Sequence, residues 1–243
     1  MSQGDDLRTC VDLQGQRPLH RPAPTIPDHE MVRCVGQGSY GEVWLARSAV
    51  GTQRAVKVVH RDRFQDSRPY EREFSGIQKY EPVSRANEGL VDILQIGRND
   101  AQGYFYYVME LADPAEPTGD YVPRTLAWEI RKRGRLPVEE CITLGLNLSL
   151  ALGHLHRHGL IHRDVKPSNI IFVNGVPKLA DIGLVTDLAE AQSFVGTESF
   201  IPPEGPNSPQ AGIYALGKVL YEAGTGKDRH EFPEPYTALG TGP

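Results

Sequence analysis

The sequence predicts an α+β fold in which a strand-rich amino-terminal part precedes a helical carboxyl-terminal part. Between residues 43 and 59 apolar and polar side chains alternate, which is the period of a half-buried strand. Over residues 138–158 and 209–223 apolar residues recur across lengths that favour helices over strands. Strands and helices are therefore expected to be segregated along the chain rather than to alternate in βαβ units.

The composition of the 243 residues is that of a globular protein, with 39% hydrophobic and 23% charged residues. The formal net charge of −5 argues against general nucleic-acid binding. The three cysteines lie far apart and have no metal-ligand spacing. No apolar stretch reaches membrane-spanning length, and the acidic first residues lack a signal-peptide profile, so a cytoplasmic protein without a membrane segment is expected.

The chain divides into three expected regions. Residues 1–28 contain four prolines and little apolar pattern, which predicts a mostly disordered tail. Residues 29–112 are expected to form strands and one helix, and residues 113–243 to be mainly helical. A loop rich in proline and glycine at residues 113–123 separates the two parts.

Three helices are expected in the second part, at residues 126–133, 138–158 and 209–223. The second is apolar enough to be buried on most of its sides. Its apolar residues are Ile142, Leu144, Leu146, Leu148, Leu150 and Leu152. Residues 181–204 have no strong periodicity and are expected to be irregular.

A glycine-rich motif, G-x-G-x-x-G, lies within residues 35–43. By itself it is weak, because dinucleotide-binding proteins use the same pattern at the start of a helix. Here the following apolar positions alternate on both sides of Gly51-Thr52, so strand, turn and strand follow the glycines. A glycine-rich turn between strands lets backbone N–H groups approach phosphates closely.

Lys57 lies on the second of these strands, which is otherwise apolar, and it needs an anionic partner. Residues 70–80 have helical spacing and carry Glu71 and Glu73. We expect Glu73 to pair with Lys57, because the family that this chain resembles, named below, has an apolar residue four positions after the paired acid, where Ile77 lies here. Glu71 is the second choice, and at least one of the two acids is expected to be solvated.

Residues 162–169 have the sequence H-R-D-V-K-P-S-N and carry the most informative chemistry of the chain. They place an acid, a cation and an amide within six residues, and few reactions other than phosphoryl transfer need that set. The carboxylate of Asp164 can accept the proton of an attacking hydroxyl, and the ammonium of Lys166 can neutralise a moving phosphoryl group. The amide oxygen of Asn169 is a hard ligand suited to Mg²⁺.

A hairpin is expected directly after this loop. Two short apolar runs at residues 170–173 and 176–180 flank Asn174-Gly175, the strongest short signal for a tight hairpin turn. Folding the hairpin about its turn brings Asn169 beside Asp181, so that an amide and a carboxylate meet as a candidate Mg²⁺ site. An ordinary surface hairpin is the competing interpretation.

Together these motifs resemble those of the protein-kinase family over about residues 29–228. The catalytic loop matches H-R-D-x-x-x-x-N, and Asp181 opens D-I-G in place of the family's D-F-G. Residues 55–57 are similar to the end of V-A-I-K. Residues 196–204 are similar to the family's G-T-x-x-Y/F-x-A-P-E, which ends an activation segment.

The resemblance implies a two-lobed protein-kinase fold that binds ATP and Mg²⁺ and acts on protein substrates. Asp164, Lys166 and Asn169 would be catalytic, and Asn169 and Asp181 would hold the metal. Met109 would stand at the entrance to the hinge, whose backbone from Glu110 to Ala112 would bind adenine. The remaining cofactor-binding residues would be Val35, Gly36, Gly38, Gly41, Val43, Ala55, Lys57, Glu73 and Ile171.

The details are most similar to bacterial serine/threonine kinases, with departures. Gly212 stands where the family has an Asp that bonds the catalytic-loop backbone. The carboxyl-terminal lobe is expected to be truncated after the long central helix, and a partner or a missing segment could complete it. A serine/threonine protein kinase is the preferred interpretation, and a nucleotide-binding pseudokinase or truncated regulatory module is the alternative. The one basic run, residues 131–135, is expected to close a helix, with docking of acidic substrates as the less favoured role.

Overall fold

The computed structural model describes residues 22–38, 41–182, 186–187 and 196–232. The elements of the amino-terminal lobe are β1 (His29–Gln37), β2 (Gly41–Ser48), β3 (Gln53–His60), η1 (Arg61–Arg63), α1 (Ser67–Ser84), β4 (Ile93–Asn99) and β5 (Tyr104–Met109). Those of the carboxyl-terminal lobe are α2 (Leu126–Arg133), α3 (Val138–Arg157), β6 (Leu160–Ile161), η2 (Pro167–Asn169), β7 (Ile170–Val173), β8 (Val176–Leu179), β9 (Thr186–Asp187), η5 (Glu198–Phe200), α4 (Pro209–Thr225) and η6 (Arg229–Glu231).

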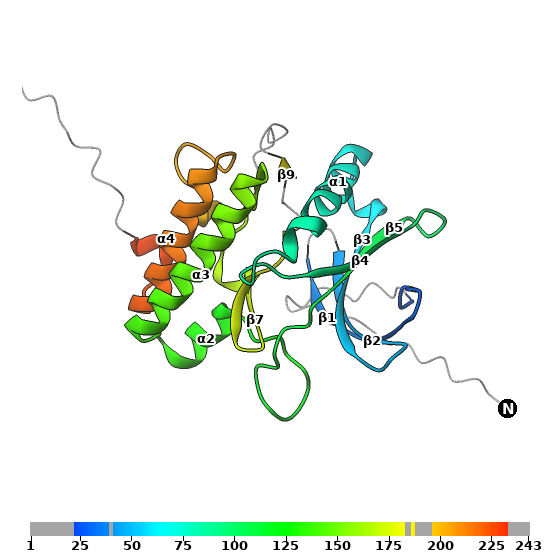
Figure 1. Cartoon of the computed structure of the whole chain (residues 1–243), viewed down its shortest axis with the longest axis horizontal. Coiled ribbons are helices and arrows are strands. Elements are labelled where there is room, and N and C mark those ends of the chain that lie inside the picture. The colour runs from blue at the N-terminus through cyan, green and yellow to red at the C-terminus, as the bar shows by residue number, and fades with distance from the viewer. Residues whose placement is uncertain (1–21, 39–40, 183–185, 188–195, 233–243) are drawn as a thin grey trace, which may run out of the picture.

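A five-stranded antiparallel sheet forms the amino-terminal lobe, in the order β1-β2-β3-β5-β4. The predicted segregation is confirmed, because the sheet and α1 lie on one side of Figure 1 and α2, α3 and α4 lie on the other. Helix α1 covers the sheet through its aromatic face. The ring of Phe74 lies 5.2 Å from that of Phe105 on β5, and Tyr70 lies 5.1 Å from the same ring. The α+β fold is thus built as two lobes.

The last residues of the expected tail contact this sheet. Ile26 is buried and forms an isolated bridge with His29. The hydroxyl of Tyr104 donates to the carbonyl of Thr25 at 2.8 Å. Within the expected tail of residues 1–28, the part from Thr25 onward therefore packs on the strands.

The helix ends follow capping chemistry that is visible in the sequence. The hydroxyl of Thr125 accepts from the amide of Trp128 at the start of α2, and Gly134 ends that helix with a φ of +76°. Ser208 caps α4 in the same way, and Gly226 ends it with a φ of +71°. Side-chain caps satisfy N–H groups that a helix leaves unpaired, and glycine tolerates the left-handed conformation at the other end.

The prediction that α3 is buried on most of its sides is wrong. Leu144, Leu148 and Leu152 are buried in the core, but the intervening apolar residues are exposed. Ile142 is 57% exposed, and Leu146 and Leu150 are each 63% exposed. Among the described elements, the helix packed most extensively against α3 is α4. Apolar content alone does not tell which faces of a helix find a neighbour.

Among the helices that the structure describes, none combines the length and the apolar character needed to cross a membrane.

Candidate active site

Three polar side chains surround the buried carboxylate of Asp164, which lies in the loop between β6 and η2. Its Oδ1 accepts from the hydroxyl of Thr197 at 2.6 Å. Its Oδ2 accepts from the amide of Asn169 at 2.7 Å and lies 2.8 Å from the ammonium of Lys166. The same ammonium donates to Thr197 at 2.8 Å. Asp164, Lys166 and Asn169, the three residues expected to be catalytic, therefore lie in contact with one another, and the hydroxyl of Thr197 joins them.

His162 fixes the backbone of this loop. Its Nε2 lies 3.1 Å from the carbonyl of Ala180, and its Nδ1 accepts from the amide of Asp164 at 3.4 Å. Burial lowers the pKa of His162 below its ordinary value, so the ring is neutral at physiological pH. One nitrogen then donates to Ala180 while the other accepts, which ties the loop to the end of β8.

The predicted hairpin of β7 and β8 is confirmed. Asn174 and Gly175 have φ values of +51° and +78°, the left-handed pair that a tight hairpin turn needs. Ile170 is the register partner of Leu179, and the amide of Ala180 donates to the carbonyl of Asn169 at 2.8 Å. This register delivers Asn169 and the residue after Ala180, which is Asp181, to the same end of the hairpin.

Lys57 reaches from β3 to the other lobe. Its ammonium lies 2.5 Å from Oδ1 of Asp181 and 4.0 Å from Oε1 of Glu73. Burial by itself would lower the pKa of Lys57, but the neighbouring Asp181, Tyr107 and Glu73 outweigh burial and raise it well above its ordinary value. The charge of Lys57 correspondingly lowers the pKa of Asp181. A cation and an anion thus join the two lobes beside the catalytic loop.

The two candidate partners on α1 differ in surroundings. Glu71 forms two 2.8 Å hydrogen bonds with Arg98, on the side away from Lys57. Glu73 is buried, and among the described residues its Oε1 has no hydrogen-bond partner. Burial raises the pKa of Glu73 to about 7, against the opposing attraction of Lys57. Glu73 is therefore the acid that faces Lys57, and it is poorly satisfied there.

The glycine-rich segment forms a turn between β1 and β2, as predicted, with residues 39–40 outside the described part. The amide of Gly38 donates to the carbonyl of Gly41 at 2.8 Å. A Cβ on Gly41 would lie 2.2 Å from the carbonyl oxygen of Val58 on β3, so no larger residue fits there. Gly36 is less restricted, because a Cβ would meet Val43 at an ordinary 3.6 Å.

The apolar residues expected around an adenine ring lie on neighbouring strands. Ala55 on β3 is the register partner of Met109 on β5, and both are buried. Val43 on β2 is the register partner of Lys57. Ile171 on β7 is half-buried and contributes to the core from the other lobe. Val35 lies half-buried on β1, one residue before the first glycine of the motif.

The hinge after β5 is held by contacts that the sequence did not indicate. The carboxylate of Glu110 accepts from the ammonium of Lys178 on β8 at 2.7 Å and from the amide of Asp92 at 2.9 Å. The hydroxyl of Tyr121, in the loop beyond the hinge, donates to the carbonyl of Ala112 at 3.1 Å. Arg33 on β1 donates in turn to the carbonyl of Tyr121. These contacts join residues far apart in the chain, so no local pattern could have shown them.

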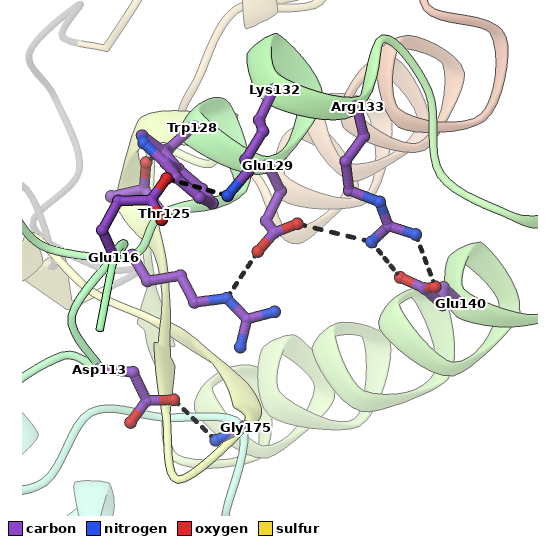
Figure 2. Close-up of polar contacts among 10 residues, drawn as sticks. Asp113, Glu116, Thr125, Trp128, Glu129, Lys132, Arg133, Glu140 and Gly175 are labelled. Carbon is purple, nitrogen blue, oxygen red and sulfur yellow. Dashed lines mark hydrogen bonds and ion pairs between the residues drawn. The ribbon is translucent and has the colours of Figure 1, made fainter. Parts of the chain in front are cut away.

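A polar network beyond the hinge fastens the hairpin and α2 to the rest of the lobe (Figure 2). The two carboxylate oxygens of Asp113 accept from the amides of Asn174 and Gly175 at 2.8 Å each. The buried Glu129 accepts from Arg124 at 2.6 Å and lies 3.5 Å from Arg133. The hinge, the hairpin and α2 therefore share one framework.

The oxygen donors at the end of the hairpin fit a magnesium ion. The side-chain nitrogen of Asn169 is used by Asp164, which leaves its amide oxygen as the donor, and Asp181 supplies a carboxylate. Mg²⁺ is commonly bound by one or two such protein groups together with substrate phosphates. No cluster of three or more His, Cys, Asp or Glu suited to a metal occurs among the described residues.

A family model of the protein kinase domain matches residues 29–234 of the chain. A probable serine/threonine-protein kinase of Clostridium perfringens is 30% identical over 208 residues, which are 82% of this chain and 29% of that protein. The DNA damage-responsive serine/threonine-protein kinase of Deinococcus radiodurans is 28% identical over 211 residues, 82% of this chain and 30% of that protein. The chain thus spans about a third of the length of these curated relatives.

Proposed function

The chain belongs to the protein kinase domain family, and from this premise we propose that it transfers the γ-phosphoryl group of ATP to serine and threonine hydroxyls of proteins. One observation carries the proposal. The hydroxyl of Thr197 donates to Asp164 and accepts from Lys166. These are the two contacts that an attacking hydroxyl needs, one to orient it and one to place a cation beside the group that it attacks.

In this function Asp164 orients the substrate hydroxyl and receives its proton. Lys166 offsets negative charge on the transferring group. Asn169 and Asp181 would hold Mg²⁺, which would neutralise part of the negative charge of the nucleotide phosphates. The glycine-rich turn and Lys57 position the phosphates, while Met109, Glu110 and Ala112 line the adenine end.

One contact favours the alternative of a nucleotide-binding module without catalytic activity. Lys57 lies closer to Asp181 than to Glu73, so the carboxylate that would bind the metal is already paired. For catalysis Lys57 has to move toward the nucleotide phosphates when ATP and Mg²⁺ enter. The two functions therefore differ in whether this ion pair gives way.

The test is incubation of the purified 243-residue chain with radiolabelled ATP and a mixture of protein substrates, with Mg²⁺ or with EDTA. We expect label on serine and threonine in the Mg²⁺ sample alone. Nucleotide affinity is measured in parallel. Binding of Mg-ATP without any transfer to the chain or to the substrates would select the non-catalytic module, and failure to bind ATP would reject both functions.

A further inference from the structure

An open cavity of about 600 Å³ lies beside the catalytic loop, between α2, residues 166–168, Thr197 and the turn at residues 226–229. Two of its lining residues, Lys166 and Thr197, also contact Asp164. An extended peptide advances about 3.3 Å per residue. A substrate that presents its hydroxyl to Asp164 would therefore bring side chains a few positions away into this cavity.

Cations dominate the polar lining of the cavity. Lys166 is neutralised by Asp164, and Arg229 is neutralised by Glu222 at 3.0 Å. Arg131 and Lys227 are exposed and form no ion pair with any residue that the structure describes. These two charges remain uncompensated in a chain whose net charge is −5.

The anions of the cavity do not cancel this excess. Glu222 is buried and is used by Arg229, through both the side chain and the backbone amide of the arginine. Asp228 caps the short helix η6 by accepting from the amide of His230 at 2.9 Å. One exposed carboxylate therefore faces two free cations, and the cavity keeps a positive surplus.

The basic run supplies one of these cations from α2, where its neighbours Lys132 and Arg133 form ion pairs within the protein. Lys132 pairs with Glu116 at 2.9 Å, and Arg133 pairs with Glu140 at 2.7 Å (Figure 2). Arg131 lines the cavity instead. Consecutive residues of a helix point in different directions, so Arg131 faces the cavity while Lys132 and Arg133 face their ion-pair partners.

The far wall of the cavity is held in place. The guanidinium of Arg229 lies 5.2 Å from the ring centre of Phe200 and donates to the hydroxyl of Ser199 at 2.8 Å. Ala127 and Ile130 of α2 add apolar surface. A fixed arginine over an aromatic ring, an apolar floor and two free cations suit a side chain with a short aliphatic stem and a carboxylate.

We propose that this cavity binds an Asp or Glu side chain of the protein substrate, near its phosphoacceptor residue, through Arg131 and Lys227. The inference rests on the proposed kinase function and adds to it the substrate class, proteins with acidic residues flanking the acceptor serine or threonine. Such contacts would act mainly on substrate affinity, because they lie outside the group of side chains that surrounds Asp164.

The experiment uses serine peptides in which one Glu is scanned through about five positions on either side of the acceptor, a span that covers the cavity in extended form. Each peptide has a matched Gln version and a matched Lys version. We expect Glu to raise kcat/KM by about three- to tenfold over Gln at one or two positions, mainly through KM, since each exposed ion pair contributes modestly. Equal values for Glu and Gln at all positions, or a preference for Lys, would overturn the inference and leave the kinase function standing.

Charge reversal identifies the cations. Arg131→Glu is expected to abolish the preference for Glu and to favour the Lys peptide at the same position, and Lys227→Glu is expected to weaken the preference. The matched control is Arg135→Glu, in the same basic run and exposed, but outside this cavity. It should keep the preference of the parent. A Glu preference that survives Arg131→Glu would also overturn the inference.

A binding measurement separates the two proposals. Fluorescence anisotropy of a labelled Glu peptide is compared with that of its Gln version in the absence of ATP, at low and high salt. Tighter binding of the Glu peptide that is lost at high salt and in Arg131→Glu would support the cavity as a site for acidic side chains, even if the kinase assay shows no transfer. Equal binding of both peptides would reject it independently of catalysis.

Discussion

Asp164 and Glu73 are both buried carboxylates, and their surroundings give them different properties. Asp164 has three side-chain partners, a hydroxyl, an amide and an ammonium, which together satisfy its oxygens. Glu73 has only the distant ammonium of Lys57 among the described residues. A buried carboxylate without close partners holds its proton more tightly. Glu73 therefore titrates near neutral pH.

Asp164→Asn is expected to abolish phosphoryl transfer and to leave ATP affinity unchanged. The amide keeps the shape of the side chain but loses the charge that accepts the proton, and a general base is worth about 10²–10⁴ in rate. Single-turnover rates and calorimetric titration with ATP test this. Asp100→Asn, at the turn between β4 and β5, is the control and should behave as the parent. Phosphoryl transfer at the parent rate in Asp164→Asn would show that Asp164 does not accept the proton of the substrate hydroxyl.

Glu73→Gln is expected to change the pH dependence of stability. Because the folded pKa of Glu73 is about 7 against an ordinary 4.5, the folded protein keeps a proton that the unfolded chain has lost. The contribution of Glu73 to stability therefore falls as the pH rises from 4.5 to 7 and stays low above 7. Thermal melts of both proteins are measured from acid to alkaline pH. Between pH 4.5 and 7 the free energy of unfolding of Glu73→Gln should rise relative to that of the parent, by on the order of 1–3 kcal/mol. A constant difference at all pH values would contradict the raised pKa.

At the scale of elements, the β7–β8 hairpin places the two expected metal ligands, Asn169 and Asp181, next to each other. Its turn is fixed from outside by Asp113, and its open end is fixed by Asn169 and His162. The hairpin was predictable because Asn-Gly between two apolar runs has a strong local preference. The carboxylate that holds the turn comes from about sixty residues earlier, and local preference says nothing of it.

Asp113→Ala is expected to lower the free energy of unfolding by about 1–2 kcal/mol, since two hydrogen bonds to a charged acceptor are lost while water replaces part of them. Thermal or urea unfolding measures the change. Asp120→Ala is the matched control in the same loop, because its side chain is 92% exposed and, within the described part of the chain, forms an ion pair with Arg33 alone. Equal effects of the two substitutions would show that Asp113 has no special role at the turn.

Gly212→Ala is expected to stabilise α4 by about 0.5–1 kcal/mol, because glycine is a poor residue inside a helix. The added Cβ would meet Leu152 at an ordinary 3.5 Å, so no clash opposes the gain. Gly212 lines a small cavity together with Asp164 of the catalytic loop, and Gly212→Asp, which restores the residue of the family pattern, is expected to raise stability or transfer rate as well. Thermal melts and rates of both variants decide. A lower melting temperature of the Asp variant without a gain in rate would mean that the loop is built around Gly212.

For the whole molecule, the contact between Lys57 and Asp181 joins β3 of the sheet to the end of the hairpin in the other lobe. Glu110 also contacts Lys178, and Arg33 donates to the carbonyl of Tyr121. The lobes are joined by these polar contacts, by one apolar core with residues from both lobes, and by backbone bonds of Leu179 with Gly89 and Val91. One of the charged pairs, between Lys57 and Asp181, involves the expected metal ligand.

Asp181→Ala and Lys57→Met are both expected to lose activity, for different reasons. Without Asp181 the metal loses its carboxylate, so the affinity for ATP should no longer respond to added Mg²⁺. Without Lys57 the response to Mg²⁺ should persist, because Asp181 is then released from its ion pair. Titration of nucleotide affinity against Mg²⁺ distinguishes them. A normal Mg²⁺ response in Asp181→Ala would refute the metal assignment.

The sequence by itself determined the α+β class and the segregation of strands from helices, and it predicted which residues form the catalytic loop. These features depend on local period, on turn chemistry and on motifs that are contiguous in the chain. It also predicted that Asn169 and Asp181 approach each other, since a two-residue turn leaves little freedom of register.

Only the tertiary structure decided which charges are paired. It placed Lys57 against Asp181 rather than directly on Glu73, left half of α3 exposed, and divided the basic run of α2 between internal ion pairs and an open cavity. The physical reason is common to the three cases. Burial and ion pairing depend on groups brought together from distant parts of the chain. The hydrophobic periodicity of a segment, or a sequence motif, describes only residues that are close together in the sequence.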